Sequence, residues 1–195
     1  IVVSATGSGP LLPPIAGLHD YIDKEEAPIW SILGMIGHIQ DYPEDLTGKK
    51  VAVVGGGAVG LDVAEFFAER NADISIIEMM PQIGKDLDPV SKNDAKTMME
   101  KHHIHQLTQT ALQEVKAHSF VVKEGGETFE VPFDYGFVCL GMRGKNQVYQ
   151  ELLTAFAGED VEIMNIGDSQ RARRIIDGTF EGRNILTVLK QKKYL

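Results

Sequence analysis

Val51-Ala-Val-Val-Gly-Gly-Gly-Ala-Val-Gly60 joins a run of small β-forming residues to the glycine spacing G-x-G-x-x-G. The run predicts a buried parallel strand over 50–54, followed by a helix with 3.6-residue periodicity. At such a turn Gly55 permits a tight bend, Gly57 lets the backbone approach a pyrophosphate, and Gly60 lets helix and strand pack closely. The motif therefore predicts a dinucleotide site.

The helix predicted over 58–70 begins at this turn. Its first N–H groups have no partner within the helix, and its N-terminus carries about half a positive charge. Phosphate groups bind at such termini. We therefore expect the backbone of Ala58 and Val59 to contact the diphosphate together with the glycines.

An acidic residue follows the glycine motif at a suitable distance. A second strand is predicted over 73–78 and ends at Glu78, 23 positions after Gly55. This spacing is typical of the carboxylate that binds the adenosine ribose. The carboxylate repels a 2′-phosphate, and no Arg stands in the next four positions, so NAD(H) is favoured over NADP(H). The alternative without a ligand is a glycine-rich turn beside a surface Glu.

The composition argues against several other functions. The chain has 195 residues, 43% of them hydrophobic, and a net charge of −9. The negative charge disfavours nucleic acid and anionic membranes as partners. No apolar run reaches the length of a membrane span, so the cytoplasm is the expected compartment. A single cysteine, Cys139, is incompatible with a C-x-x-C pair or a Cys₄ metal site within this chain.

The remaining pattern predicts an α/β fold in which a Rossmann-like three-layer (ββα) domain carries an antiparallel meander over a parallel sheet. A polar, turn-rich stretch suggests a domain boundary near Gly48. The other predicted elements are a strand over 1–5, a helix within 27–39 with Pro28 in its first turn, a helix capped by Asp88 and running from Pro89 to Lys101, a strand over 104–107, meander strands over 112–116, 118–123 and 128–131, strands over 135–140 and 161–166, a helix or loop over 146–156, and a last helix over 173–190 that Gly178 and Gly182 could interrupt.

Further acidic residues and histidines leave alternatives open. Asp62, in the first helical turn, could face the nicotinamide end of a cleft or simply favour the helix N-terminus. Asp168 ends a strand and could bind a sugar or polyol hydroxyl, or cap the next helix. His102, His103 and His105 lie where a helix runs into a strand, so their side chains diverge and a metal site is not expected.

Five motifs, taken in order, resemble the two-dinucleotide flavoprotein reductases. The similarity is greatest to the C-terminal portion of the 2,4-dienoyl-CoA reductase, trimethylamine dehydrogenase and enoate reductase group, often labelled NADH oxidase or NADH:flavin oxidoreductase. The motifs are Ala5-Thr6-Gly7, Gly55-Gly-Gly57-Ala-Val-Gly60, Glu78-Met-Met-Pro-Gln-Ile-Gly-Lys-Asp-Leu-Asp88, Leu140-Gly-Met-Arg143 and Ile166-Gly-Asp168.

The resemblance implies an NAD(P)H-binding domain over 48–141, inserted into an FAD-binding domain of which 1–47 and 142–195 are the later parts. It places Thr6 and Gly7 by the FAD, the carboxylate of Asp168 on the ribityl chain, and Asp62 and Gly141 near the nicotinamide. The family has Glu where this chain has the shorter Asp62. The Gly-rich FAD fingerprint and an FMN and iron–sulfur barrel are expected upstream of Ile1, so the chain is expected to be a fragment that retains FAD weakly or not at all and is inactive alone.

The intact protein is then expected to move a hydride from NADH to FAD and electrons onward to a second flavin and an acceptor. Two rivals stay open at this stage: a pyridine nucleotide-disulfide reductase whose C-x-x-C pair lies upstream, and a module that holds ADP or NAD without catalysis. The sequence also leaves homo-oligomerisation open.

Overall fold

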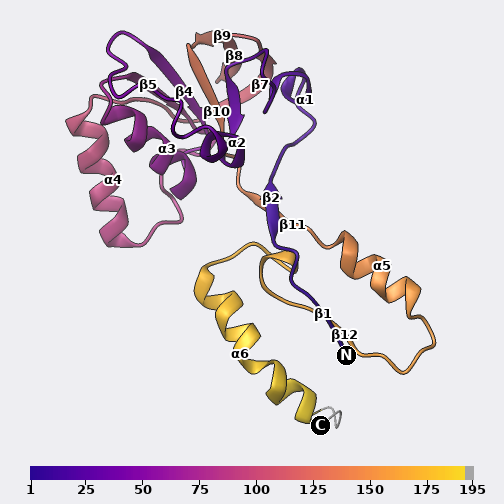
Figure 1. Ribbon diagram of the computed structural model, residues 1–195. Helices are drawn as coiled ribbons and strands as arrows, with labels where there is room; N and C mark the ends of the chain where they lie inside the picture. The colour runs from indigo at the N-terminus through magenta and orange to yellow at the C-terminus, as the bar shows by residue number, and fades with distance from the viewer. Residues whose placement is uncertain (192–195) are drawn as a thin grey trace. The chain divides into compact units, whose positions relative to one another are not determined.

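The computed structural model describes residues 1–191, which divide into two compact units (Figure 1). The larger unit spans Pro10–Gly141. The described part of the smaller unit comprises Ile1–Gly9 and 142–191. Residues 10–47 thus pack within the larger unit, although the sequence pattern suggested a boundary near Gly48. The assignment of 48–141 to NAD(P)H and of the flanking segments to FAD stays a prediction.

A parallel five-stranded sheet forms the centre of the larger unit. Its buried middle strands carry almost continuous apolar runs, as strands covered on both faces do. The predicted strands over 50–54 and 73–78 are both confirmed, as β4 and β5. In spatial order the strands are β3 (Ile29–Ser31), β10 (Tyr135–Val138), β4 (Lys50–Val54), β5 (Asp73–Ile77) and β6 (His105–Leu107).

Two helices cover one face of this sheet (Figure 1). Helix α3 (Ala58–Ala68) buries Phe67 completely, and α4 (Pro89–Lys101) contributes Met99 to the same apolar cluster. The Asp88 carboxylate accepts hydrogen bonds from the N–H groups of Val90 and Ser91, which confirms the predicted cap of α4.

The meander covers the other face. Strands β7 (Thr110–Lys116), β8 (Ser119–Glu124) and β9 (Glu127–Pro132) pair antiparallel in sequence order. Phe120 and Val122 are fully buried in a second apolar cluster that includes Val54 of the parallel sheet. A short helix, α1 (Leu18–Tyr21), packs with this cluster through Leu18. Helices, parallel sheet and meander are therefore three layers, and the predicted fold class is confirmed.

The segment 27–39 contains the predicted helix, but Pro28 does not lie in its first turn. It forms edge strand β3 followed by α2 (Ile32–Gly37), and Pro28 precedes the strand. The Gly136 N–H donates to the Pro28 carbonyl at 2.7 Å, and β3 pairs with β10. Ser31 then caps α2 by accepting from the Gly34 N–H at 3.2 Å. Pairing with a strand distant in the chain thus overrides the local helical pattern.

The smaller unit contains a parallel pair, β1 (Val2–Ser4) with β12 (Ile163–Asn165), and helix α5 (Gln147–Ala155). Strand β2 (Ser8–Pro10) pairs with β11 (Met142–Gly144). After the short 3₁₀ turn η1 (Gly167–Ser169), helix α6 (Ile175–Gln191) runs through Gly178 and Gly182 without the suggested interruption. No helix among residues 1–191 is long and apolar enough to cross a membrane.

Candidate nucleotide-binding site

The three glycines of the motif differ in what a side chain at each position would meet. Gly55 has a φ of +104°, and a Cβ there would lie 2.3 Å from the Cys139 carbonyl oxygen. A Cβ on Gly60 would lie 1.8 Å from the Gly55 carbonyl oxygen. Helix α3 therefore packs so close to the turn that only glycine fits at this position. Gly57 is the N-cap of α3, and within the described chain a Cβ there would meet nothing within 4 Å. The turn therefore leaves Gly57 open to a ligand.

Glu78 lies against this turn. Its Oε2 accepts from the Gly56 N–H and its Oε1 from the Met80 N–H, both at 2.7 Å. A carboxylate can accept about four hydrogen bonds, so each oxygen keeps capacity for a further donor. The side chain is half-buried rather than directed into open solvent. The structure thus places Glu78 beside the glycine turn, in contact with Gly56.

A pocket of about 160 Å³ lies at the carboxyl ends of the central strands. Its lining is mostly apolar, with the Glu78 carboxylate as its charged group, so it can hold a flat ring system joined to a hydroxyl-bearing group. The lining residues at or just after the ends of the central strands are Val54, Gly55, Ile77, Glu78, Met79 and Leu140, and those from the loop after β2 and from the meander are Pro13, Ile15, Thr110, Ala111 and Leu112.

Asp62 belongs to another pocket. It lies with Ala58 in a hollow of about 280 Å³ between α3 and α4, together with Leu87 and Asp94. Partial removal from water raises the pKa of Asp62. Val59 is half-buried and packs against the cluster under α3, and Gly141, with a φ of +105°, follows the pocket residue Leu140. Asp62 and Glu78 therefore do not line a common pocket.

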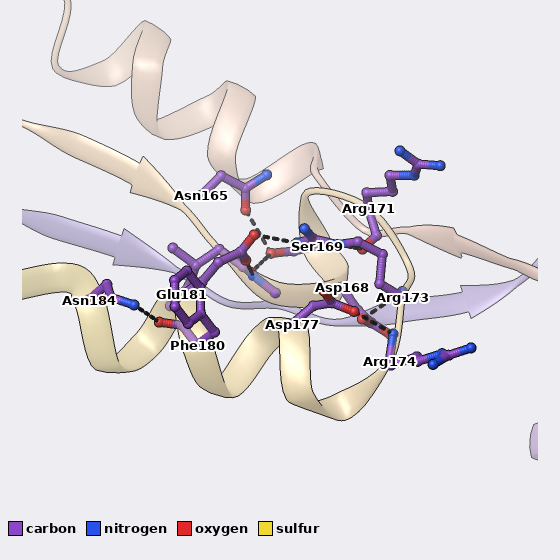
Figure 2. Close-up of polar contacts among 12 residues, drawn as sticks. Asn165, Asp168, Ser169, Arg171, Arg173, Arg174, Asp177, Phe180, Glu181 and Asn184 are labelled. Atoms are coloured by element: carbon purple, nitrogen blue, oxygen red, sulfur yellow. Dashed lines mark hydrogen bonds and ion pairs between the residues drawn. The ribbon is translucent and has the colours of Figure 1, made fainter. Parts of the chain in front are cut away.

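In the smaller unit the predicted residues Thr6, Gly7 and Asp168 are close to the ends of short strands. The Thr6 hydroxyl donates to the Lys145 carbonyl, and the Gly7 carbonyl accepts from the Lys145 N–H at 2.8 Å. Asp168 accepts from the Ser8 hydroxyl at 3.1 Å. It also accepts from the Arg173 N–H at 3.2 Å (Figure 2).

The contacts of Asp168 bear on its two predicted roles. Asp168 accepts from the N–H of Arg173, which lies two positions before α6 begins at Ile175. The N–H of Arg174, the residue next to the helix, donates to Asp177 instead. Asp168 therefore orders the loop before the helix, and its carboxylate keeps acceptor capacity for a ligand hydroxyl. Ser8 was missed by the sequence reasoning, although it directly follows Gly7.

The histidines form no metal-binding set, and part of the pocket lining was not predicted from sequence. Within residues 1–191 no cluster of His, Cys, Asp and Glu could hold a metal ion. His105 instead lies 3.5 Å from an Asp73 carboxylate oxygen at the exposed sheet edge. The pocket residues Pro13, Ile15 and Thr110 carried no sequence signal, because they meet the sheet only through long-range packing.

Comparison with known proteins shows the family of the chain. A sequence profile of the pyridine nucleotide-disulphide oxidoreductase family matches residues 1–163. The chain belongs to this family. An NADH oxidase of Thermoanaerobacter brockii is 29% identical over 183 residues, which cover 93% of this chain and 26% of the relative. A bilirubin reductase of Mediterraneibacter gnavus is 28% identical over 191 residues, which cover 96% of this chain and 27% of the relative.

A solved structure of 2-naphthoyl-CoA reductase with 2-naphthoyl-CoA superimposes with a TM-score of 0.74 at 22% identity, over 92% of this chain and 25% of that one. At this identity the likeness shows the fold alone. The chain spans only about a quarter of the length of these relatives. The flavoprotein resemblance is thus confirmed at the level of the pyridine nucleotide-disulphide oxidoreductase family, and the narrower enoate reductase group stays a prediction.

Cys139 is the single cysteine of this sequence, so it has no partner for a disulfide within the chain. Its side chain is buried at the end of the β10 strand. Burial first, and the nearby charge of Asp62 second, raise the pKa of the Cys139 thiol to about 12. At pH 8 roughly one molecule in ten thousand then carries the reactive thiolate.

We expect Cys139 to resist alkylation. Iodoacetamide at pH 8 should leave the native protein unmodified over an hour, as read by intact mass, because the thiol is both protonated and covered. The same reagent in denaturing urea is the control and should label the chain once. Rapid labelling of the native protein would contradict the buried position.

Proposed function

We propose that the larger unit binds NADH, with the diphosphate on the turn at Gly55–Gly60 and the adenosine ribose on Glu78. The observation that carries this proposal is the Glu78 carboxylate, held 2.7 Å from the Gly56 N–H at the carboxyl ends of parallel strands. Ligands of open parallel sheets bind at this end. The adenine would occupy the mostly apolar pocket beside Met79 and Thr110.

The residues present fit such a ligand. Open space at Gly57 leaves room for a diphosphate, and the positive end of α3 would stabilise its charge. The free acceptor capacity of Glu78 suits the two ribose hydroxyls, which are donors. Ala58 and Val59 would contribute backbone N–H groups, and Asp62 and Gly141 would lie towards the nicotinamide.

For the smaller unit we propose a share in an FAD site, with Thr6, Gly7 and Asp168 as its contacts. The Asp168 carboxylate, ordered by Ser8 and Arg173, would accept a hydrogen bond from a ribityl hydroxyl. When bound, FAD supplies the redox chemistry, accepting a hydride from NADH and passing the electrons on. The chain's own residues bind and orient the two cofactors.

The whole protein would then be an NADH:flavin oxidoreductase of the 2,4-dienoyl-CoA and enoate reductase type. Support comes from relatives that are an NADH oxidase and a bilirubin reductase. An FMN and iron–sulfur barrel domain would receive the electrons. The 48–141 segment would be the NAD(P)H-binding domain, with the flanking segments as parts of the FAD-binding domain.

We expect NADH to bind at least ten times more tightly than NADPH or ADP. Charge-assisted hydrogen bonds to Glu78 are worth about 1.5–3 kcal/mol, and the same carboxylate repels a 2′-phosphate. NADH should bind more tightly than ADP, because contacts on the nicotinamide side add to those on the adenosine side. Isothermal titration calorimetry with the three nucleotides measures all three affinities. Equal affinities for NADH and ADP would favour the module that binds without catalysis.

The variant Glu78→Gln tests the source of the preference. It keeps an acceptor for one backbone N–H but loses the charge, so NADH should bind more weakly and the ratio of NADH to NADPH affinity should approach one. Glu124→Gln, on an exposed acid at the end of β8, is the matched control and should leave the ratio unchanged. Tighter binding of NADPH by the unaltered protein would overturn the assignment of Glu78.

A further inference from the structure

Glu181 ties together both ends of the loop that carries Asp168. Its Oε2 accepts from the Gly167 N–H at 2.6 Å, and its Oε1 accepts from the Arg173 guanidinium at 2.5 Å (Figure 2). Gly167 immediately precedes Asp168, and the Arg173 N–H donates to Asp168 itself. We propose that Glu181 is a positioning residue that sets the orientation of the Asp168 carboxylate through Gly167 and Arg173.

The loop needs such an external support. Gly167 has a φ of +65°, and the following residues form only the short turn η1 before α6 begins. The contacts of Asp168 itself, at 3.1 Å from Ser8 and 3.2 Å from Arg173, are longer than those of Glu181. The place of the carboxylate therefore depends on where the backbone of Gly167 and Arg173 is held.

The Glu181–Arg173 pair is well suited to this role. The exposed fractions of the two side chains are 28% for Arg173 and 23% for Glu181, lower than those of the other ion pairs in the described part of the chain. The guanidinium also donates to the Arg171 carbonyl at 3.2 Å, which fixes a second point of the same loop. The Gly167 N–H first, and Arg173 second, lower the pKa of Glu181, so it stays ionised at neutral pH.

Neighbouring arginines provide a matched contrast. Figure 2 shows the side chains of Arg171 and Arg174 pointing away from this network, while that of Arg173 points into it. Glu181 thus acts on the flavin site through one of three nearby arginines. The inference rests on the proposed flavin role of Asp168 and adds a residue, on a different element, that would be required for it.

The test is a double-mutant cycle in the flavin-containing protein. FAD is removed and then titrated back, and the dissociation constant is read from flavin fluorescence. Asp168→Asn alone should weaken FAD binding at least about tenfold, because a charge-assisted contact is lost. Glu181→Ala and Arg173→Gln should each weaken it by several-fold. The double variant Asp168→Asn with Glu181→Ala should bind no worse than Asp168→Asn, because Glu181 acts through Asp168.

The controls separate positioning from loss of structure. Arg171→Gln removes the same charge from the same loop, and Asn184→Ala changes a side chain of α6 that donates to the Phe180 carbonyl. The FAD dissociation constant of each variant should stay within about twofold of that of the unaltered protein. Glu181→Gln keeps an acceptor for the Gly167 N–H and should restore part of the affinity and the visible flavin spectrum. It also replaces Glu181→Ala in the cycle if that variant fails to fold.

Two results overturn the inference in distinguishable ways. If Asp168→Asn weakens binding but the effects of Glu181 and Asp168 add independently, or Glu181→Ala binds normally, the positioning role fails and the flavin role of Asp168 stands. If Asp168→Asn binds FAD as tightly as the unaltered protein, the proposed flavin site itself fails, and the role of Glu181 fails with it.

Discussion

Replacing Gly57 by Ala is expected to weaken NADH binding at least tenfold while leaving the melting temperature almost unchanged. The φ of Gly57 is −78°, which Ala adopts freely, and within the described chain a Cβ there would meet nothing within 4 Å. The added methyl group therefore costs the empty protein little. It would occupy the space through which a diphosphate approaches the start of α3, and so it acts on the complex alone.

Two measurements check this result. Calorimetry gives the NADH affinity, and thermal unfolding gives the melting temperature of the nucleotide-free protein. Gly37→Ala is the control, because Gly37 also lies in open space at a helix end of the larger unit. It should leave the NADH affinity unchanged and should not lower the melting temperature. Normal NADH binding by Gly57→Ala would mean that the diphosphate does not pass over this turn.

The central βαβ unit could be predicted from sequence because its signals are local. The apolar run of β4 and the glycine turn lie within a few residues of one another, and so do Asp88 and the start of α4. The closeness of Glu78 to the turn could also be expected from the strand pattern, because neighbouring parallel strands bring their carboxyl ends to one edge of a sheet. Alternation and a Gly-Gly turn predicted the meander in the same way.

The parts that could not be predicted depend on contacts between distant segments. Segment 27–39 begins as a strand because β10, about a hundred residues later, offers it a pairing edge. Pro13 and Thr110 line the pocket only because the loop after β2 and the meander fold over the same strand ends. Glu181 reaches Gly167 across a turn that sequence spacing does not describe. Such long-range contacts have no local periodicity to reveal them.

The glycines also show why one motif can carry two separate constraints. At Gly57 the free space lies outside the protein, so a side chain would interfere with a ligand. At Gly60 the neighbour is the protein's own backbone, since a Cβ would lie 1.8 Å from the Gly55 carbonyl oxygen. The G-x-G-x-x-G spacing does not distinguish these cases, whereas the structure does. Substitution at the two positions should therefore affect different measurements.

Gly60→Ala is expected to destabilise the larger unit strongly. The conformation of Gly60 in α3 suits Ala, but its Cβ would lie 1.8 Å from the Gly55 carbonyl oxygen and 3.4 Å from Val53. Backbone cannot rotate away as a side chain would, so α3 must move from β4. Overpacking of this kind costs about 1–3 kcal/mol or more, and a loss near the upper figure lowers the melting temperature by roughly 10 °C.

Thermal and urea unfolding of Gly60→Ala measure this loss, with Gly182→Ala as the matched control. Gly182 lies inside α6, where within the described residues a Cβ would meet nothing within 4 Å. Ala there should stabilise its helix by about 0.5–1 kcal/mol, because glycine is the poorer helix former. The same chemical change should thus have opposite signs at the two positions. Unfolding of Gly60→Ala at the same temperature and urea concentration as the unaltered protein would show that α3 and β4 are not in close contact at the turn. The proposed diphosphate site at Gly55–Gly60 would then be contradicted as well.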